Sequence, residues 1–225
     1  MKNNLLKIVC GGMLLSLIGA NPAHALSFGA NIITNGGAEK GLGAADAVEV
    51  TALPQWKRKG KLTAVQYNAP GFLTATSPDP RNRGKNFFAG GPDNRLSKAI
   101  KTIDLSSVTS AIDGNGVSYV LSGYFGGYSS QNDHAVLSAV FFDASNQRLN
   151  QVSIGNVLAT DRADTTSLLL RKLNGIIPAG TRSVELTLTM SRTDGSYNDG
   201  YADSLSLVLT EIVPPSTASL QSSDH

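Results

Sequence analysis

The chain has 225 residues, of which 41% are hydrophobic and 16% are charged. Its 19 Lys and Arg residues fall to 17 when Lys2 and Lys7 are set aside, equal to its 17 Asp and Glu residues. Balanced charge gives no electrostatic reason to expect nucleic acid or an anionic membrane as a partner. One cluster, Lys57-Arg58-Lys59 with Lys61, departs from this balance, and we interpret it as an exposed loop or an edge strand.

Residues 1–25 have the pattern of a secretory signal peptide. Lys2 and Lys7 precede an apolar run (8–20), which is followed by a proline and by the small-residue sequence Ala23-His24-Ala25. The run is shorter than the ~20 residues that span a membrane. We therefore expect cleavage after the last alanine and a secreted protein, extracellular or periplasmic, with no membrane insertion.

The rest of the chain is predicted to be all-β. Apolar and polar residues alternate in 184–190 and 205–209, which is the period of a strand with one buried face. Other strand candidates are 62–67, 98–105, 117–125, 135–143, 148–154 and 166–173, separated by Gly, Asn, Asp and Pro. Residues 106–112 form at most a short helical turn, and 78–95 are expected to be a long ordered loop.

Many short strands with turns between them predict one β-sandwich or jelly roll. We expect this domain to cover 26–212, because no internal repeat divides it, and we expect a flexible polar tail over 213–225. The single cysteine lies in the signal segment, so the domain has none. Its stability must then come from core burial or from a bound metal.

Two motifs bracket the domain: Asn35-Gly36-Gly37-Ala38-Glu39 near its start and Ala202-Asp203-Ser204-Leu205-Ser206-Leu207 near its end. Together they resemble the galactose-binding-like jelly-roll superfamily, in particular carbohydrate-binding module families 4 and 9 and related secreted bacterial domains. The resemblance implies a single jelly-roll β-sandwich of two antiparallel sheets, with the first and last strands close together.

The same resemblance implies a structural calcium ion beside the two end strands, with Glu39 and Asp203 as its carboxylate ligands. Calcium prefers six to eight oxygen ligands, and carboxylates supply both charge and ligand atoms. The alternative is that both side chains only accept hydrogen bonds from turn backbone. The acidic segment 194–199 does not fit the spacing of an EF-hand and is interpreted as exposed turn.

Sugar binding, the function that the resemblance implies most often, needs aromatic faces beside polar side chains. The candidates are Tyr124 and Tyr128 in a Gly-rich segment, Asn132 on its polar rim, and Phe88 if its ring is exposed. The alternative is a Gly-rich strand end whose tyrosines pack on the rim of the core. Trp56 is expected in the core.

We expect no enzymatic activity, because His134 is the one histidine of the expected domain and no G-x-S-x-G segment accompanies it. The leading hypothesis is a non-catalytic protein that binds a glycan or polysaccharide. The alternative is a structural or adhesive protein of the extracellular matrix or envelope that binds protein partners. A hydrolase with two carboxylates is the third possibility.

Overall fold

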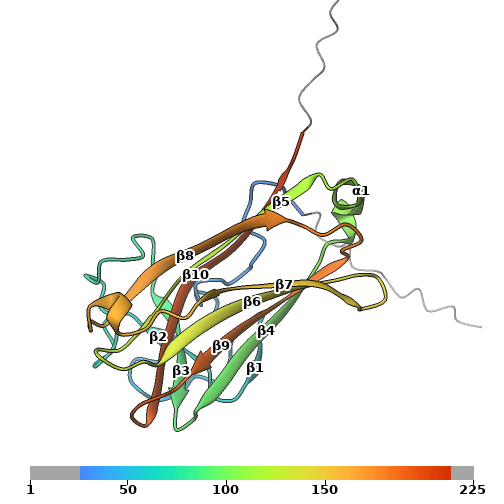
Figure 1. Ribbon diagram of the computed structural model, residues 1–225. Helices are drawn as coiled ribbons and strands as arrows, with labels where there is room; N and C mark the ends of the chain where they lie inside the picture. Colours follow the sequence, from blue (N-terminus) through green and yellow to red (C-terminus); the bar gives the residue numbers. More distant parts are fainter. Residues whose placement is uncertain (1–25, 214–225) are drawn as a thin grey trace, which may run out of the picture.

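The computed structural model describes residues 26–213, so the expected signal peptide and residues 214–225 of the expected tail lie outside it. Two five-stranded antiparallel sheets form a β-sandwich (Figure 1). Sheet I has the order β1-β4-β9-β6-β7, and sheet II has the order β2-β3-β10-β5-β8. This confirms the predicted fold class.

The sheets are built from ten strands. Those of sheet I are β1 (Lys57–Lys59), β4 (Leu96–Asp104), β9 (Ser183–Ser191), β6 (His134–Phe142) and β7 (Arg148–Gly155). Those of sheet II are β2 (Thr63–Gln66), β3 (Asn86–Pro92), β10 (Tyr197–Glu211), β5 (Val117–Gly127) and β8 (Ser167–Ile176). Three short helical segments, η1 (Ser106–Val108), α1 (Thr109–Asp113) and η2 (Thr160–Arg162), connect them. No helix among residues 26–213 is long and apolar enough to cross a bilayer.

The main core lies between the two sheets, where the alternating apolar residues of the strands meet. In β9, Val184, Leu186 and Leu188 are fully buried, as their period of two predicts. Trp56 also belongs to this core, and its indole N–H donates to the carbonyl of Asn35 at 3.0 Å. Each large side chain buried in this way stabilises the fold by roughly 1.5–3 kcal/mol.

A second hydrophobic cluster covers the outer face of sheet II. Phe87 and Tyr201 form its centre, with ring centroids 5.2 Å apart, and Phe72 covers them from the 67–85 loop. This second cluster explains why both members of the Phe87-Phe88 pair are buried: Phe88 faces the main core and packs on Trp56 at 5.9 Å. Sheet II is therefore covered on both faces in this region.

The prediction that 78–95 is a loop is wrong for its second half, which forms β3 between β2 and β10. The glycines of this segment look like strand breakers, but they are needed for close packing. A Cβ at Gly90 would lie 2.2 Å from the Asn198 side chain, and one at Gly91 would lie 1.9 Å from the carbonyl oxygen of Lys61. Glycine here serves close backbone approach within a sheet.

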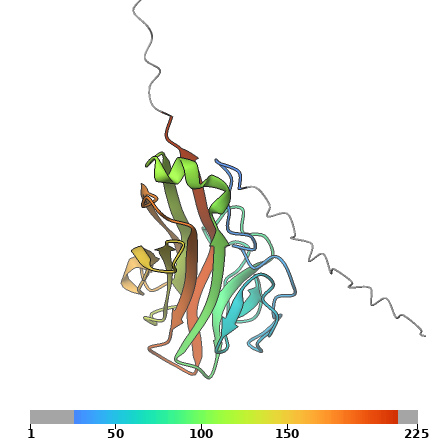
Figure 2. The same cartoon turned by 90° about the vertical axis from the view of Figure 1, so that its right-hand side faces the viewer.

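The two end motifs meet in space. Asn31 donates to the carbonyl of Leu205 and accepts from the amide of Leu207, and the amide of Leu205 donates to the carbonyl of Gly36 at 2.9 Å. The segment before β1 therefore continues sheet II beside the second half of β10. Figure 2 shows this segment running along the sandwich next to the C-terminal strand.

Candidate functional site

A small pocket lies at one end of sheet II, where β5 ends and β10 begins. Tyr128, Tyr197, Phe72 and Asp199 line it, together with Ala47, Pro70 and Gly71, and we call it the tyrosine pocket. Its volume is about 240 Å³. Tyr128 directly follows β5 and is 39% exposed, whereas Tyr197 is half-buried with its ring edge-on to Phe72 at 5.2 Å.

The glycines before Tyr128 allow this arrangement. A Cβ at Gly127 would lie 2.8 Å from the carbonyl oxygen of Asp199 and 2.7 Å from that of Asp133. Only a residue without a side chain lets the end of β5 come so close to β10. The Gly-rich segment therefore places Tyr128 beside Asp199.

Two polar groups of the pocket have hydrogen-bonding capacity to spare. The hydroxyl of Tyr197 is buried and has no hydrogen-bond partner among the described residues. The carboxyl group of Asp199 accepts a hydrogen bond from Tyr201 through Oδ1, and within residues 26–213 no hydrogen bond reaches its Oδ2. A buried polar group without a partner is costly unless water or a ligand satisfies it.

Burial raises the pKa of Asp199 to about 6. The hydrogen bond from Tyr201 and the nearby Arg162 act in the opposite direction, while the Asp133 carboxylate raises the pKa further. Burial also raises the pKa of Tyr197, and the charge of Asp199 adds to this effect. The pocket thus combines an exposed aromatic ring, a neutral phenol and a carboxyl group that titrates near pH 6.

The walls of the pocket are held by two buried charged side chains. Asp133 Oδ1 accepts from the amides of Thr193 and Asp194, and its Oδ2 accepts from the amide of Asp199 at 2.8 Å. Arg162 donates to carbonyl oxygens of the loop after Tyr128, those of Ser129 at 2.9 Å and Gln131 at 2.8 Å. These bonds fix the β9–β10 hairpin against the β5–β6 loop.

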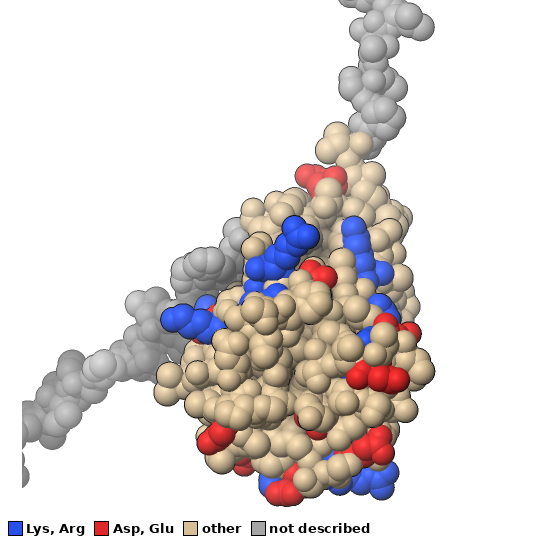
Figure 3. All heavy atoms as spheres, turned by 90° about the vertical axis from the view of Figure 1, so that its left-hand side faces the viewer, with Lys and Arg blue, Asp and Glu red and all other residues tan. Residues whose placement is uncertain are grey.

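Charged side chains lie near the pocket: besides burial, Asp199, Glu49 and Asp46 raise the pKa of Tyr197. Figure 3 shows the side on which the η2 loop and the loop after β2 lie, and the Lys, Arg, Asp and Glu side chains gather mainly at its margins.

The structure places the four predicted ligand residues in different surroundings. Tyr128 lines the tyrosine pocket, and Tyr124 is half-buried against the second cluster. Phe88 is a correction: its ring is completely buried in the main core, so no ligand reaches it. Asn132 is exposed but is not among the residues that line the pocket, and its Oδ1 accepts from the amide of Ala159 at 3.2 Å.

Sequence reasoning missed Tyr197 and Asp199. The segment 194–199 was interpreted as exposed turn, but Asn198 is fully buried and Asp199 is only 8% exposed. The available signal was the spacing of Tyr197, Asp199 and Tyr201, a polar and aromatic alternation at the start of β10.

Both candidate metal ligands lie near Gly37. A Cβ at Gly37 would lie 3.2 Å from Asp203 Oδ1 and 3.7 Å from Glu39 Cγ. Asp203 is completely buried, and it accepts hydrogen bonds from the Tyr67 hydroxyl at 2.7 Å and from the Ser204 amide. Burial raises its pKa to about 8, and the charge of Glu39 adds to the effect.

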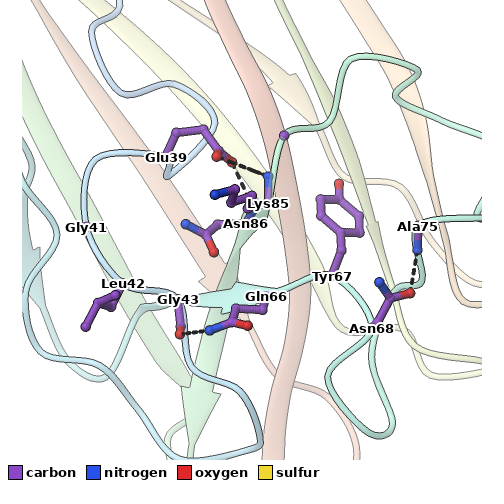
Figure 4. Close-up of a pocket in the computed structure, with 11 residues that line it drawn as sticks. Glu39, Gly41, Leu42, Gly43, Gln66, Tyr67, Asn68, Ala75, Lys85 and Asn86 are labelled. Atoms are coloured by element: carbon purple, nitrogen blue, oxygen red, sulfur yellow. Dashed lines mark hydrogen bonds between the residues drawn. The ribbon is translucent and has the colours of Figure 1, made fainter.

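Glu39 lines a second pocket of about 460 Å³ between the 39–43 segment and the loop 66–86 (Figure 4). Its carboxylate accepts hydrogen bonds from the amides of Lys85 and Asn86. The other polar side chains hold loops: Gln66 donates to the Gly43 carbonyl at 2.8 Å, and Asn68 accepts from Ala75 at 2.9 Å. The pocket wall is thus largely hydrogen-bonded within the protein.

A divalent cation at Glu39 and Asp203 would have to displace hydrogen bonds, because each of their four carboxyl oxygens accepts one within the protein. Neither Glu39 nor Asp203 takes part in an ion pair among the described residues, although one of the two carboxyl groups is buried. No group of three or more His, Cys, Asp or Glu side chains suitable for a metal occurs in the described part of the chain. Further ligands would therefore be backbone carbonyl or water oxygens, which calcium accepts.

No family model matches the sequence, and no curated protein matches it. Solved structures with a similar fold include the enzymatically active domain of the bacteriophage CBA120 tailspike protein 4, with 13% identity and a TM-score of 0.49. That match covers 81% of this chain but only 21% of the tailspike chain.

Carbohydrate-binding modules of families 4, 16 and 22 also have this fold. The C-terminal family 22 module of Clostridium thermocellum Xyn10B has 10% identity and a TM-score of 0.41, over 73% of this chain and 92% of the module. A CBM4 module has 14% identity and a TM-score of 0.39, over 79% of this chain and 99% of the module. Scores and identities this low assign the chain no ligand or activity.

Proposed function

We propose that this protein is a non-catalytic carbohydrate-binding protein whose ligand occupies the tyrosine pocket. The observation that carries the proposal is that the exposed Tyr128 ring and the Asp199 carboxyl group line the same pocket, beside Tyr197. A sugar ring needs an aromatic surface for its apolar face and convergent donors and acceptors for its hydroxyl groups.

The size of the pocket favours a short ligand. Its volume of about 240 Å³ is below the roughly 300–1,000 Å³ of pockets that enclose drug-sized molecules. One sugar ring, or the end of a longer chain, fits this volume. The Asp199 carboxyl group, whose Oδ2 accepts no hydrogen bond within residues 26–213, is the acceptor that this pocket offers to a sugar hydroxyl.

The test is a screen of soluble glycans and insoluble polysaccharides with the purified protein. We expect saturable binding to one class of sugar, weakened about tenfold or more by Tyr128→Ala and by Asp199→Asn. Leu170→Ala is the matched control, because Leu170 is 51% exposed and lies outside the pocket. Absence of binding to any glycan by the folded protein would overturn the proposal and favour the alternative of a protein-binding matrix or envelope component.

We further propose that Glu39 and Asp203 hold a structural calcium ion. The support is that Asp203 is buried and that the charge of Glu39 acts on it, with no ion-pair partner for either among the described residues. A divalent cation would neutralise both charges and join the two ends of the domain. An ion that binds only the native state raises its stability by mass action.

Thermal unfolding with added calcium and with chelator tests the metal. Calcium should raise the Tm of the wild-type protein, and Glu39→Gln should abolish the shift. Glu185→Gln is the matched control, since Glu185 lies on the outer face of sheet I. Calcium titration by calorimetry gives an independent readout, and a wild-type protein with neither binding heat nor a Tm shift would refute the calcium site.

We also propose that the protein is exported, on the strength of the signal-peptide pattern in residues 1–25. Intact mass of the protein recovered from cells that express the full chain tests this. A mature chain that begins at Leu26 supports export, and a chain that retains residues 1–25 in the soluble cell fraction contradicts it.

A further inference from the structure

The basic cluster on β1 continues onto the neighbouring strand, β4. The interpretation of β1 as an edge strand does not explain the lysine on β4. Lys59 of β1 lies directly opposite Lys98 of β4, and Lys57 lies two residues along on the same face. Lysine on an edge strand discourages pairing with other chains. Strand β4 is not an edge strand, because β1 and β9 flank it, so Lys98 has no such role.

Two lysines directly opposite one another on a sheet repel and cost stability. Among residues 26–213, no acidic side chain forms an ion pair with Lys57, Lys59 or Lys98. The residue between the two β1 lysines differs: Arg58 points to the other face and pairs with Glu49. The lysines of the outer face are thus left free to meet an external anion.

Three hydroxyl side chains extend this basic edge partway across sheet I, on a face that they share with Ile100 and Val136. The register pairs Lys98 with Thr189 of β9, and it places Thr187 opposite Ser138 of β6. The intervening residues Leu188 and Leu137 are buried, so these hydroxyls face outward, where the strands lie about 4.8 Å apart. We call Lys57, Lys59, Lys98, Thr187, Thr189 and Ser138 the lysine–threonine strip.

We propose that the lysine–threonine strip binds an acidic polysaccharide. The ammonium groups fit carboxylate or sulfate groups by charge, and the three hydroxyl side chains can hydrogen-bond to the hydroxyl groups of an extended sugar chain. The strip contains no aromatic side chain on which nucleic-acid bases could stack. It is separate from the tyrosine pocket, which belongs to sheet II, so this inference does not depend on the proposed function.

Affinity electrophoresis in gels containing polygalacturonate tests the strip. The wild-type protein should be retarded at low salt and released at about 1 M NaCl, where the Debye length falls to about 3 Å. In the triple variant Lys57→Gln/Lys59→Gln/Lys98→Gln, the affinity for polygalacturonate should fall by a factor of about ten or more. Because the substitutions remove like-charge repulsion from an exposed face, its Tm should not fall.

The matched control is Arg81→Gln/Arg148→Gln/Lys172→Gln, which changes the net charge equally at exposed positions elsewhere. This control should keep wild-type retardation. If both triple variants lost the same amount of retardation, the effect would be explained by net charge alone, and the proposal would be overturned. Retention of binding by the strip variant, or equal affinity of the wild-type protein for duplex DNA, would also overturn it.

Discussion

The hydroxyl of Tyr67 donates a hydrogen bond of 2.7 Å to the buried carboxyl group of Asp203, which joins the end of β2 to the middle of β10. The two residues are 136 positions apart in the sequence. This bond connects the second hydrophobic cluster to the motif that closes the domain.

Tyr67→Phe tests this connection. The variant keeps the ring in the second cluster but removes a donor from a buried carboxyl group, so we expect a loss of about 1–3 kcal/mol in the free energy of unfolding. Urea denaturation measures it. Tyr128→Phe is the control and should stay within about 0.5 kcal/mol, because its hydroxyl makes no hydrogen bond among the described residues. Equal effects of the two variants would contradict the role given to this bond.

Gly36→Ala tests the junction of the two end motifs. A Cβ at this position would lie 2.1 Å from the carbonyl oxygen of Leu205, so the first segment must move away from β10. We expect a destabilisation of more than about 2 kcal/mol. Gly114→Ala serves as control, because its φ is −77° and its nearest atoms lie at 3.5 Å. Thermal unfolding that gives the two variants the same Tm would rule out a strained junction.

The alternation of apolar residues was enough to predict the fold. The strands β4 to β9 begin and end within about three residues of their predicted limits. In β5, β6 and β9 one face is buried, and the resulting period of two is visible in the sequence. The missing strand, β3, is buried on both faces and contains two consecutive glycines, so it shows no such period. A strand of this kind cannot be predicted from its own sequence pattern and is recognised only from the strands that pair with it.

The candidate site was harder to predict because a bulge changes the phase of β10. Ser204 has a φ of +51°, and the register shifts between Asp203 and Ser206. Leu205 and Leu207 face the main core. Tyr201 lies an even number of residues before them, so a regular strand would point it to the same face, yet it belongs to the second cluster on the opposite face. Extending the leucine alternation backwards would bury Tyr201 and Asp203 on the wrong side of the sheet.

The stability of the protein should depend on pH through Asp199. Its pKa is raised from 3.8 to about 6 in the folded protein. Between about pH 4 and pH 6 the folded state therefore keeps a proton that the unfolded state has released. This contribution is fully present below about pH 4 and is lost as the pH rises through about 6.

Its size is on the order of 3 kcal/mol, at 1.36 kcal/mol for each pKa unit. Urea denaturation from pH 4 to 7 measures it as the difference between the wild-type protein and Asp199→Asn. The free energy of unfolding of the wild-type protein should fall relative to that of Asp199→Asn as the pH rises to about 6, and the difference should then stay constant. A constant difference over this range would show that Asp199 does not titrate in this window.

Asp133 should control the shape of the tyrosine pocket without contacting the ligand. Its carboxylate accepts from the amides of Thr193, Asp194 and Asp199, so an amide group at this position would direct its own N–H toward one of these donors. We expect Asp133→Asn to lower the free energy of unfolding by about 2–4 kcal/mol. The β9–β10 hairpin would then be held less firmly against the end of β5.

Because the same hairpin carries Tyr197 and Asp199, Asp133→Asn should also weaken glycan binding at temperatures where the protein remains folded. Asp194→Asn is the control on this hairpin: Asp194 is exposed, and its substitution should change stability by no more than about 0.5 kcal/mol. Calorimetric titration below the Tm of each variant separates binding from unfolding. If Asp133→Asn lost stability but bound glycan as tightly as the wild type, the hairpin would not position the ligand groups, and the site would have to lie elsewhere.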